Sequence, residues 1–388
     1  MRQAGAALKM AAIALAITCA GGLAACSPPV GPGDIATGTT GSAVPTTSAG
    51  GPIDTPTTQE PVPAGESTSP RTSAPTAAAS VVTAVPPVTV GRDAWVAVSV
   101  TTLWRTPTSA RAVDRPALAN PAGIRLWLSR MTLTDRRALN GRADTQALLG
   151  DRVIVVGRSG SWVKVVVPDQ PTPLDARGYP GWVPTAQLTG LPPVVSGLVA
   201  TVVARTTYLR TDNASATPVT EISFGTRLPR VGLAGAWVRV STPAGRVLRL
   251  AASAVAVRAP TTSALPRTGG DVVRVAQMFT GLPYLWAGRS GFGFDCSGLT
   301  SLDYRVHGVV IPRDADAQAV KGTAVSISAP RSGDLLFYAT SGHVHHVSIY
   351  AGGGRMVQSP RTGSTVQTIA MSTPSYAREL VGARRLVG

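Results

Sequence analysis

Hydrophobic and polar residues follow different periods in different parts of this chain, and the periods predict where strands and helices lie. Residues 89–259 contain short alternating runs separated by Gly and Pro, which is typical of β-strands joined by turns. From residues 271 and 296 onward, apolar residues recur every three or four positions, which predicts two amphipathic helices. Helices followed by strands predict an α+β domain. The expected strands are residues 334–339, 344–351 and 355–358.

The β-rich part contains an internal repeat. Residues 152–168 and 227–243 share a Gly turn, a Trp-Val-x-Val strand and a closing Pro. Residues 101–106 and 206–211 also correspond, but they lie further apart, so the first copy carries an insertion at about residues 109–144. Each copy therefore predicts one short all-β unit of the kind that closes into a small barrel.

Both repeat units resemble bacterial SH3-like domains. We expect the first to span residues 89–190, insertion included, and the second to span residues 191–259. In wall enzymes such domains bind or shape the substrate, and the resemblance implies the same here. A role as plain spacers is the alternative, because a fold does not fix a function. A Pro, Thr and Ser linker at residues 260–270 precedes the C-terminal domain, residues 271–388, whose first helix we expect Asp271 to cap.

Residues 1–25 have the pattern of an export signal. A basic start is followed by an apolar stretch at residues 10–18, which is shorter than a bilayer requires, and then by small residues. Residues 23–26, Leu-Ala-Ala-Cys, resemble the lipobox of bacterial lipoproteins, which implies cleavage before Cys26 and a diacylglycerol on its sulfur. Such a lipid would anchor the protein to the membrane without a transmembrane helix. The alternative is an ordinary signal peptide in which Cys26 is incidental.

The next segment, residues 26–88, is expected to be a disordered tether. Pro, Thr, Ser, Gly and Ala dominate it and it has no aromatic residue, so it cannot bury a core. A flexible coil of that length spans roughly 40 Å. The tether would carry the folded head from the outer face of the cell membrane into the wall.

The charge of the chain lies in the head. The formal net charge is +16, whereas the tether is mildly acidic. The Arg residues are scattered and the aromatic content is only 5%, so no stacking platform for nucleic acid is evident. Export also argues against nucleic acid. We therefore expect no nucleic-acid partner and expect the head to adhere to an anionic cell wall.

The candidate nucleophile is Cys296. The chain has 3 cysteines, and Cys19 and Cys26 lie in or at the end of the export signal, so Cys296 cannot form a disulfide within the head. It lies in the first turn of a predicted helix, where exposed N–H groups and the helix dipole favour thiolate over thiol. A thiolate nucleophile needs a neighbouring imidazole as base, and that imidazole needs an orienting partner.

Four histidines are available as the base. His307 is eleven residues along the helix from Cys296, roughly 16 Å away at 1.5 Å per residue, which is too far. His343, His345 and His346 precede or enter a predicted strand. Because side chains alternate along a strand, His345 and His346 point to opposite faces, and periodicity alone does not choose between them.

Ordered motifs in the C-terminal domain resemble those of the NlpC-type cell-wall peptidases, papain-like cysteine enzymes that cut peptidoglycan stem peptides. The resemblance implies that Cys296 is the nucleophile and His346 the base. It also implies that Gln358, where the family often has histidine, orients the imidazole. Tyr284 matches a position beside the nucleophile, where its phenol would donate to the oxyanion or simply pack. The matching segments are residues 283–288, 294–299, 312–313, 333–335, 346–350 and 356–360.

The whole head resembles the three-domain γ-D-glutamyl-L-diamino-acid endopeptidases, which prefer stem peptides with a free N-terminal L-Ala. One departure is Ala315, which stands where the family has a substrate-contacting serine. One amine contact is therefore missing, unless Asp314 or Asp316 supplies it. The substrate-binding residues that the resemblance implies are Asp295, Ser297, Asp144 and Tyr179.

The expected fold is thus an α+β papain-like (NlpC-type) catalytic domain preceded by two small all-β SH3-like barrels. The expected function is hydrolysis of the bond between γ-D-Glu and the diamino acid of peptidoglycan stem peptides, with no metal or cofactor. One alternative is a non-catalytic wall-binding lipoprotein, against which the intact Cys296 and His346 argue. The other is an amidase or acyltransferase on the same scaffold.

Overall fold

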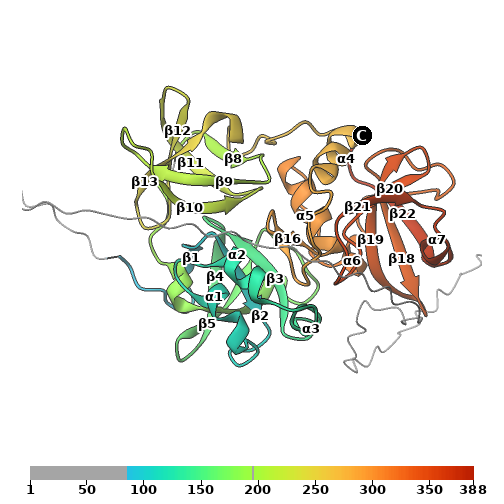
Figure 1. Ribbon diagram of the computed structural model, residues 1–388, viewed down its shortest axis with the longest axis horizontal. Helices are drawn as coiled ribbons and strands as arrows, with labels where there is room; N and C mark the ends of the chain where they lie inside the picture. The colour runs from blue at the N-terminus through green and yellow to red at the C-terminus, as the bar shows by residue number, and fades with distance from the viewer. Residues whose placement is uncertain (1–84, 195) are drawn as a thin grey trace, which may run out of the picture. The chain divides into compact units, whose positions relative to one another are not determined.

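A computed structural model describes residues 85–194 and 196–388 of this chain, and residues 85–388 belong to one compact unit (Figure 1). The predicted export signal, the predicted lipidation site Cys26 and nearly all of the predicted tether lie outside the described residues. Within the described ranges, helices are too short or too polar to cross a bilayer.

The first β unit is a seven-stranded antiparallel sheet with the strand order β3-β2-β6-β5-β4-β1-β7. Alternate apolar side chains, among them Val153, Val155 and Val163, point inward and are fully buried, as the period-two pattern predicts. The strands are β1 (Asp93–Val96), β2 (Val100–Trp104), β3 (Ala143–Leu148), β4 (Arg152–Ser159), β5 (Trp162–Val167), β6 (Tyr179–Pro184) and β7 (Leu188–Thr189), with the 3-10 turn η2 (Thr185–Gln187) before β7.

Four short helices lie between β2 and β3, where the insertion is predicted. They are held together by Trp127, whose indole nitrogen donates to the buried Asp114 at 2.8 Å and whose ring lies 6.4 Å from that of Trp104. Both tryptophans belong to the same hydrophobic cluster as the helices of the C-terminal domain. The helices are η1 (Ala112–Asp114), α1 (Arg115–Leu118), α2 (Ile124–Arg130) and α3 (Leu133–Arg137).

The second β unit repeats the connectivity of the first, with the strand order β10-β9-β13-β12-β11-β8-β14. The repeated sequence forms the hairpins β4–β5 and β11–β12, which carry bulges at Gly157 and Gly232. Their turns use Gly160 and Gly235 at φ 55° and 57°, which glycine adopts without strain. The strands are β8 (Val199–Val202), β9 (Thr206–Thr211), β10 (Pro218–Ser223), β11 (Arg227–Ala234), β12 (Trp237–Ser241), β13 (Val247–Ala251) and β14 (Val255–Arg258), with η3 (Ala252–Ala254) before β14.

The C-terminal domain has the predicted α+β composition, with an antiparallel sheet in the order β17-β22-β18-β19-β20-β21. Helices α4 and α5 pack against each other and against β19. The elements are α4 (Gly269–Met278), β15 (Arg289–Ser290), β16 (Gly293–Phe294), α5 (Cys296–Val306), α6 (Ala315–Gln318), β17 (Thr323–Val325), β18 (Leu335–Thr340), β19 (His343–Gly352), β20 (Arg355–Gln358), β21 (Gln367–Ala370), α7 (Pro374–Glu379) and β22 (Leu380–Arg385).

The cap of the first helix in this domain differs from the prediction. Thr268, not Asp271, is the N-cap, and its hydroxyl accepts a hydrogen bond from the Asp271 N–H. Thr268 has the extended backbone that a cap requires, with φ −113° and ψ 150°. Asp271 instead lies in the first turn, where its charge still favours the positive end of the helix.

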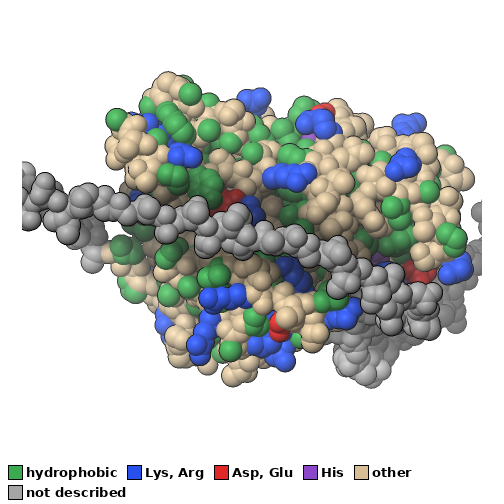
Figure 2. Space-filling model, in the orientation of Figure 1, with side chains coloured by type: hydrophobic (Ala, Val, Ile, Leu, Met, Phe, Trp, Pro, Cys, Tyr) green, Lys and Arg blue, Asp and Glu red, His purple; other side chains and the backbone are tan. Residues whose placement is uncertain are grey.

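The exterior of the described region is basic. Figure 2 shows more Lys and Arg than Asp and Glu side chains on the visible face, and they are scattered among polar and apolar groups. This distribution matches the positive charge expected for the head.

Candidate active site

Cys296 is the first residue of α5, as predicted, and is almost completely buried. Asp295 caps this helix, and its carboxylate accepts the Gly298 N–H at 2.6 Å. A side chain at Gly298 would clash with the carbonyl oxygen of Gly288, so glycine allows the loop before the helix to approach closely. The helix N-terminus places a positive electrostatic potential at the thiol, which favours the thiolate.

Tyr284 lies beside this helix start. It is buried, and it forms an isolated parallel bridge with Phe294, two positions before Cys296. Its backbone N–H donates to the Ser364 carbonyl at 2.9 Å, which fixes the segment. The structure thus brings Tyr284 to the neighbourhood of the candidate nucleophile, where the resemblance expects it.

His346 lies on β19 with its side chain buried, and its Nε2 is 2.6 Å from Gln358 Oε1 on the neighbouring strand β20. Because the Gln358 carbonyl oxygen can only accept, Nε2 must carry the hydrogen and Nδ1 is left as the basic nitrogen. The imidazole packs beside two tyrosine rings, with centroids 5.3 Å from Tyr338 and 5.7 Å from Tyr376, and these two rings lie 5.5 Å from each other. These contacts hold the ring in one orientation.

The other histidines lie elsewhere. His345 is the extra residue at a register shift between β18 and β19, and its Nε2 is 3.2 Å from the Thr340 hydroxyl and 3.5 Å from Glu379. His343 is exposed at the start of the strand. His307 follows α5 and is buried against Asp303, at 3.3 Å, and the Pro266 carbonyl. The alternation expected from the sequence is therefore interrupted at His345, because β19 has one residue more than β18 there.

Tyr376, on α7, is a candidate site residue that the sequence analysis missed. Burial raises the pKa of its phenol, the nearby Gln358 amide lowers it, and Cys296 is close enough to raise it further. The Gln358 Nε2 has no acceptor with hydrogen-bond geometry in the described ranges. Its influence on Tyr376 is therefore electrostatic. Tyr376 lies outside the family motifs, and an aromatic residue in a short helix gives no distinguishing signal.

The substrate-side candidates gather around Arg313, whose importance the sequence analysis also missed. The buried guanidinium donates to both oxygens of Asp295, at 3.1 and 2.6 Å, and to the Ser297 hydroxyl at 2.9 Å. Its Nε donates to the Thr145 hydroxyl of the first β unit at 2.7 Å. Burial works to lower the pKa of Arg313, but Asp295 outweighs burial and raises it. Arg313 thus joins the first β unit to the residue that caps α5.

Tyr179 and Asp144 come to this region from the first β unit. The buried Tyr179 hydroxyl donates to Asp314 at 3.4 Å, and Asp144 is close enough to contribute to a raised Tyr179 pKa, which burial mainly causes. Asp144 is also paired with Arg105 at 2.8 Å, so its charge is partly neutralised. The predicted binding residues are therefore near one another, although Asp144 is less available than expected.

Asp314 and Asp316, the two residues that flank Ala315, differ in their surroundings: Asp314 accepts from Tyr179, and Asp316 is exposed. Burial raises the pKa of Asp314 to about 6, while Arg313 opposes that effect. Asp316 is exposed, and Ala315 is buried at the start of α6. Within residues 85–194 and 196–388, no group of three or more His, Cys, Asp or Glu side chains could hold a metal ion.

Comparison with known proteins agrees with this geometry. Residues 281–385 match the NlpC/P60 family, and residues 202–257 match the YKFC SH3b2 domain. A gamma-D-glutamyl-L-lysine dipeptidyl-peptidase of Bacillus cereus is 39% identical over 300 residues, which cover 75% of this chain and 90% of that protein. One of Bacillus subtilis is 37% identical over 292 residues, covering 74% and 96%. The crystal structure of an NlpC/P60 family protein from Bacillus cereus superposes with a TM-score of 0.72 at 38% identity, covering 76% of this chain and 100% of that one.

Proposed function

This chain belongs to the NlpC/P60 family of cysteine peptidases, and on that basis we propose that it hydrolyses the bond between γ-D-Glu and the diamino acid of peptidoglycan stem peptides. The observation that carries the proposal is a cysteine at a helix N-terminus combined with a buried His346–Gln358 pair on the sheet that this helix covers. These are the parts that thiol-dependent acyl transfer requires.

The proposed chemistry assigns one role to each residue. His346 Nδ1 takes the thiol proton, and the Cys296 sulfur attacks the γ-carbonyl carbon of D-Glu. Backbone N–H groups at the start of α5, together with the Tyr284 phenol, stabilise the oxyanion. The imidazolium then gives its proton to the departing amine of the diamino acid, and water hydrolyses the thioester. Gln358 keeps Nε2 protonated throughout.

We further propose that the substrate carries a free N-terminal L-Ala. An ammonium group entering a partly enclosed site needs acidic or hydrogen-bonding partners. Such groups are Asp144 and Tyr179 of the first β unit and Asp314 of the C-terminal domain, which lie near one another. Asp295 and Ser297 are both engaged by Arg313, which supports a role in shaping the pocket next to the nucleophile.

Both β units are proposed to be SH3-like barrels. Their shared strand order and the match of the second unit to an SH3b2 domain support this assignment. The first unit would form one wall of the substrate site. The second would support the C-terminal domain.

A cell-envelope location fits a family of cell-wall hydrolases. We propose that a diacylglycerol on Cys26 anchors the protein to the outer face of the membrane, as the lipobox-like sequence indicates. A diacylglyceryl mass on the N-terminal peptide tests the anchor, and Cys26→Ser should release the protein from membranes. An unmodified Cys26 at the mature N-terminus would contradict it.

The catalytic assignment is tested by alkylation. Iodoacetamide should label Cys296 near neutral pH faster than a model thiol with a pKa of about 8.5, and labelling should abolish cleavage of muropeptides. Full cleavage by the alkylated protein or by Cys296→Ala would contradict the proposed function.

A further inference from the structure

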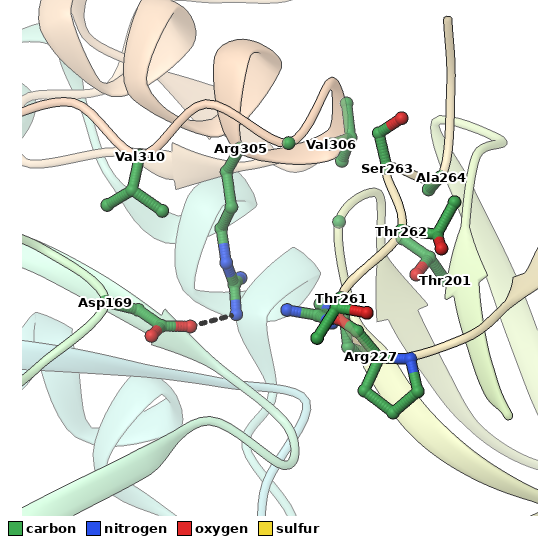
Figure 3. Close-up of a pocket in the computed structure, with 13 residues that line it drawn as sticks. Asp169, Thr201, Arg227, Thr261, Thr262, Ser263, Ala264, Arg305, Val306 and Val310 are labelled. Atoms are coloured by element: carbon green, nitrogen blue, oxygen red, sulfur yellow. Dashed lines mark hydrogen bonds and ion pairs between the residues drawn. The ribbon is translucent and has the colours of Figure 1, made fainter. Parts of the chain in front are cut away.

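A polar pocket lies at the opposite end of α5 from Cys296, where both β units meet the C-terminal domain and its preceding linker (Figure 3). Its volume is about 190 Å³, larger than an engineered cavity of 150 Å³ that binds benzene. Arg305 reaches into it from α5, Asp169 from the first β unit and Arg227 from the second. Residues 260–264 of the linker close one side.

The charges around this pocket do not balance. Arg305 is paired with the buried Asp151 at 2.7 Å and with the half-exposed Asp169 at 2.8 Å. Arg227 has no carboxylate within 4.0 Å in the described part of the chain, and its Nη2 donates only to the Pro260 carbonyl at 2.8 Å. Arg289, buried nearby, also has no ion-pair partner among the described residues, and its charge acts on Asp169. With Arg289, which does not line the pocket, three guanidinium groups lie near two carboxylates.

Hydrogen-bond donors are also left over. The Arg305 side chain is only 5% exposed, yet its Nε and Nη1 find no acceptor in residues 85–194 and 196–388. The Nη1 of Arg289 is in the same situation. Figure 3 shows the guanidinium of Arg227 facing that of Arg305 across the pocket. Two cations that face each other in a partly enclosed space repel, and an anion between them would relieve that repulsion.

We propose that this pocket binds a phosphate group, which would lie between Arg227 and Arg305. Guanidinium groups donate in a planar fork that matches phosphate oxygens, and a phosphate accepts more hydrogen bonds than a carboxylate does. The hydroxyls of Thr201, Thr262 and Ser263 line the same pocket and supply further donors. Asp169 is the acidic side chain on the lining. Because it is half-exposed, water can screen its repulsion of a bound phosphate.

The proposed site is separate from the active site. Arg305 is nine residues along α5 from Cys296, which is roughly 13 Å at 1.5 Å per residue. A bound phosphate would bridge the second β unit and the C-terminal domain across the linker. Binding would therefore stabilise their junction, since a ligand that binds only the folded state raises stability by mass action.

The test is calorimetric titration of the proposed mature protein, residues 26–388, with inorganic phosphate at constant ionic strength. One site should be observed, and phosphate should raise the thermal midpoint. Arg227→Gln should weaken binding by roughly ten- to a hundredfold, because one charge-assisted contact is lost. Arg258→Gln, an exposed arginine on β14 of the same unit, removes the same charge outside the pocket and should bind as the wild type does.

A second variant guards against a folding defect in Arg227→Gln. Thr262→Val leaves the charges unchanged and changes only an exposed linker residue of the pocket, and we expect it to weaken phosphate binding severalfold. Titration with glycerol 3-phosphate separates the two sources of the group. Binding as tight as that of inorganic phosphate assigns the site to an esterified phosphate, and binding of inorganic phosphate alone assigns it to the free ion. No heat of binding, or equal binding by the Arg227 and Arg258 variants, overturns the proposal.

Discussion

The two β units share a sequence repeat and a strand order, yet they meet the C-terminal domain differently: the first contacts residues near both ends of α5, whereas the second contributes to the pocket at its end. The first unit brings Thr145 and Tyr179 to Arg313 and Asp314, near the start of α5. The second contributes Arg227 to the pocket near the end of α5.

The difference arises at the edges of the sheets. In the first unit, helices α1 to α3 lie between β2 and β3, and Trp127 carries them into the hydrophobic cluster of the C-terminal domain. In the second unit the equivalent strands β9 and β10 are joined by a short turn. The inserted segment thus gives the first unit an additional contact with the C-terminal domain.

The largest loss of activity is expected for a change in the C-terminal domain itself, at His346. His346→Ala should lower kcat by at least about a hundredfold, because the buried imidazole that Gln358 orients is lost. His345→Ala is the matched control, since the neighbouring imidazole contacts Thr340 rather than Gln358, and it should retain most of the activity. Steady-state kinetics on a stem tripeptide measures both variants, and the reverse ranking would show that the wrong histidine has been assigned as the base.

The next largest effect is expected on substrate preference, and it distinguishes the first β unit from the second. Tyr179→Phe and Asp144→Asn should reduce the preference for a free over an N-acetylated L-Ala, measured as a ratio of kcat/KM values. A charge-assisted hydrogen bond is worth roughly 1.5–3 kcal/mol, or about ten- to a hundredfold in rate. We expect the lower half of that range, because Ala315 supplies no hydroxyl and Asp144 is shared with Arg105.

The controls for that experiment come from the second unit. Tyr208 is exposed on β9, and Asp212 is paired with Arg239 much as Asp144 is paired with Arg105. Tyr208→Phe and Asp212→Asn should leave the preference unchanged. An equal loss in both units would remove the distinction between them.

The same preference should depend on pH through Asp314. Its carboxyl has a pKa of about 6, whereas an α-amino group stays protonated up to about pH 7.7–8.0. Between these values both groups are charged and attract each other. As the pH falls through 6 the carboxyl becomes neutral, so the preference for a free amine should decline, and in Asp314→Asn it should stay flat across this window.

A smaller loss of kcat is expected for changes at Gln358, the hydrogen-bond partner of the His346 imidazole. Gln358→Ala should lower kcat by about tenfold, because the imidazole loses the acceptor that fixes its tautomer, whereas Gln358→His should remain active. Unchanged kinetics in the alanine variant would reduce Gln358 to a packing residue.

The smallest effect concerns Tyr376. Tyr376→Phe keeps the ring beside His346 but removes the hydroxyl near Gln358, so we expect a loss of a few-fold in kcat with little change in KM. A shift in the pH profile of kcat would separate positioning of the imidazole from a general packing defect. A larger loss in Tyr376→Phe than in Gln358→Ala would contradict this order.

Much of this organisation could be predicted from the sequence because it depends on local periodicity and on short motifs. Helix α5 begins at Cys296, and strands β18, β19 and β20 lie within a residue or so of the expected runs. The internal repeat predicted two similar β units, which share one strand order. Alternation alone did not choose between His345 and His346, and a register shift at His345 interrupts it. The motifs favoured His346, whose role stays a prediction.

Contacts between distant segments could not be predicted. Periodicity shows which face of an element is buried but not which remote segment covers it. The Arg313 contacts with Thr145, the pairing of Arg305 with Asp151 and the approach of Tyr376 to His346 all join elements far apart in the chain. The expected cap at Asp271 was wrong because Thr268 offers an equally suitable side chain three residues earlier.

The most direct test of the central claim is the mass of the products from L-Ala-γ-D-Glu-diaminopimelate. The wild-type protein should release L-Ala-D-Glu and free diaminopimelate, and Cys296→Ala should release neither. Cleavage between L-Ala and D-Glu, or unchanged release by Cys296→Ala, would contradict a thiol-dependent cut at the γ-D-glutamyl bond.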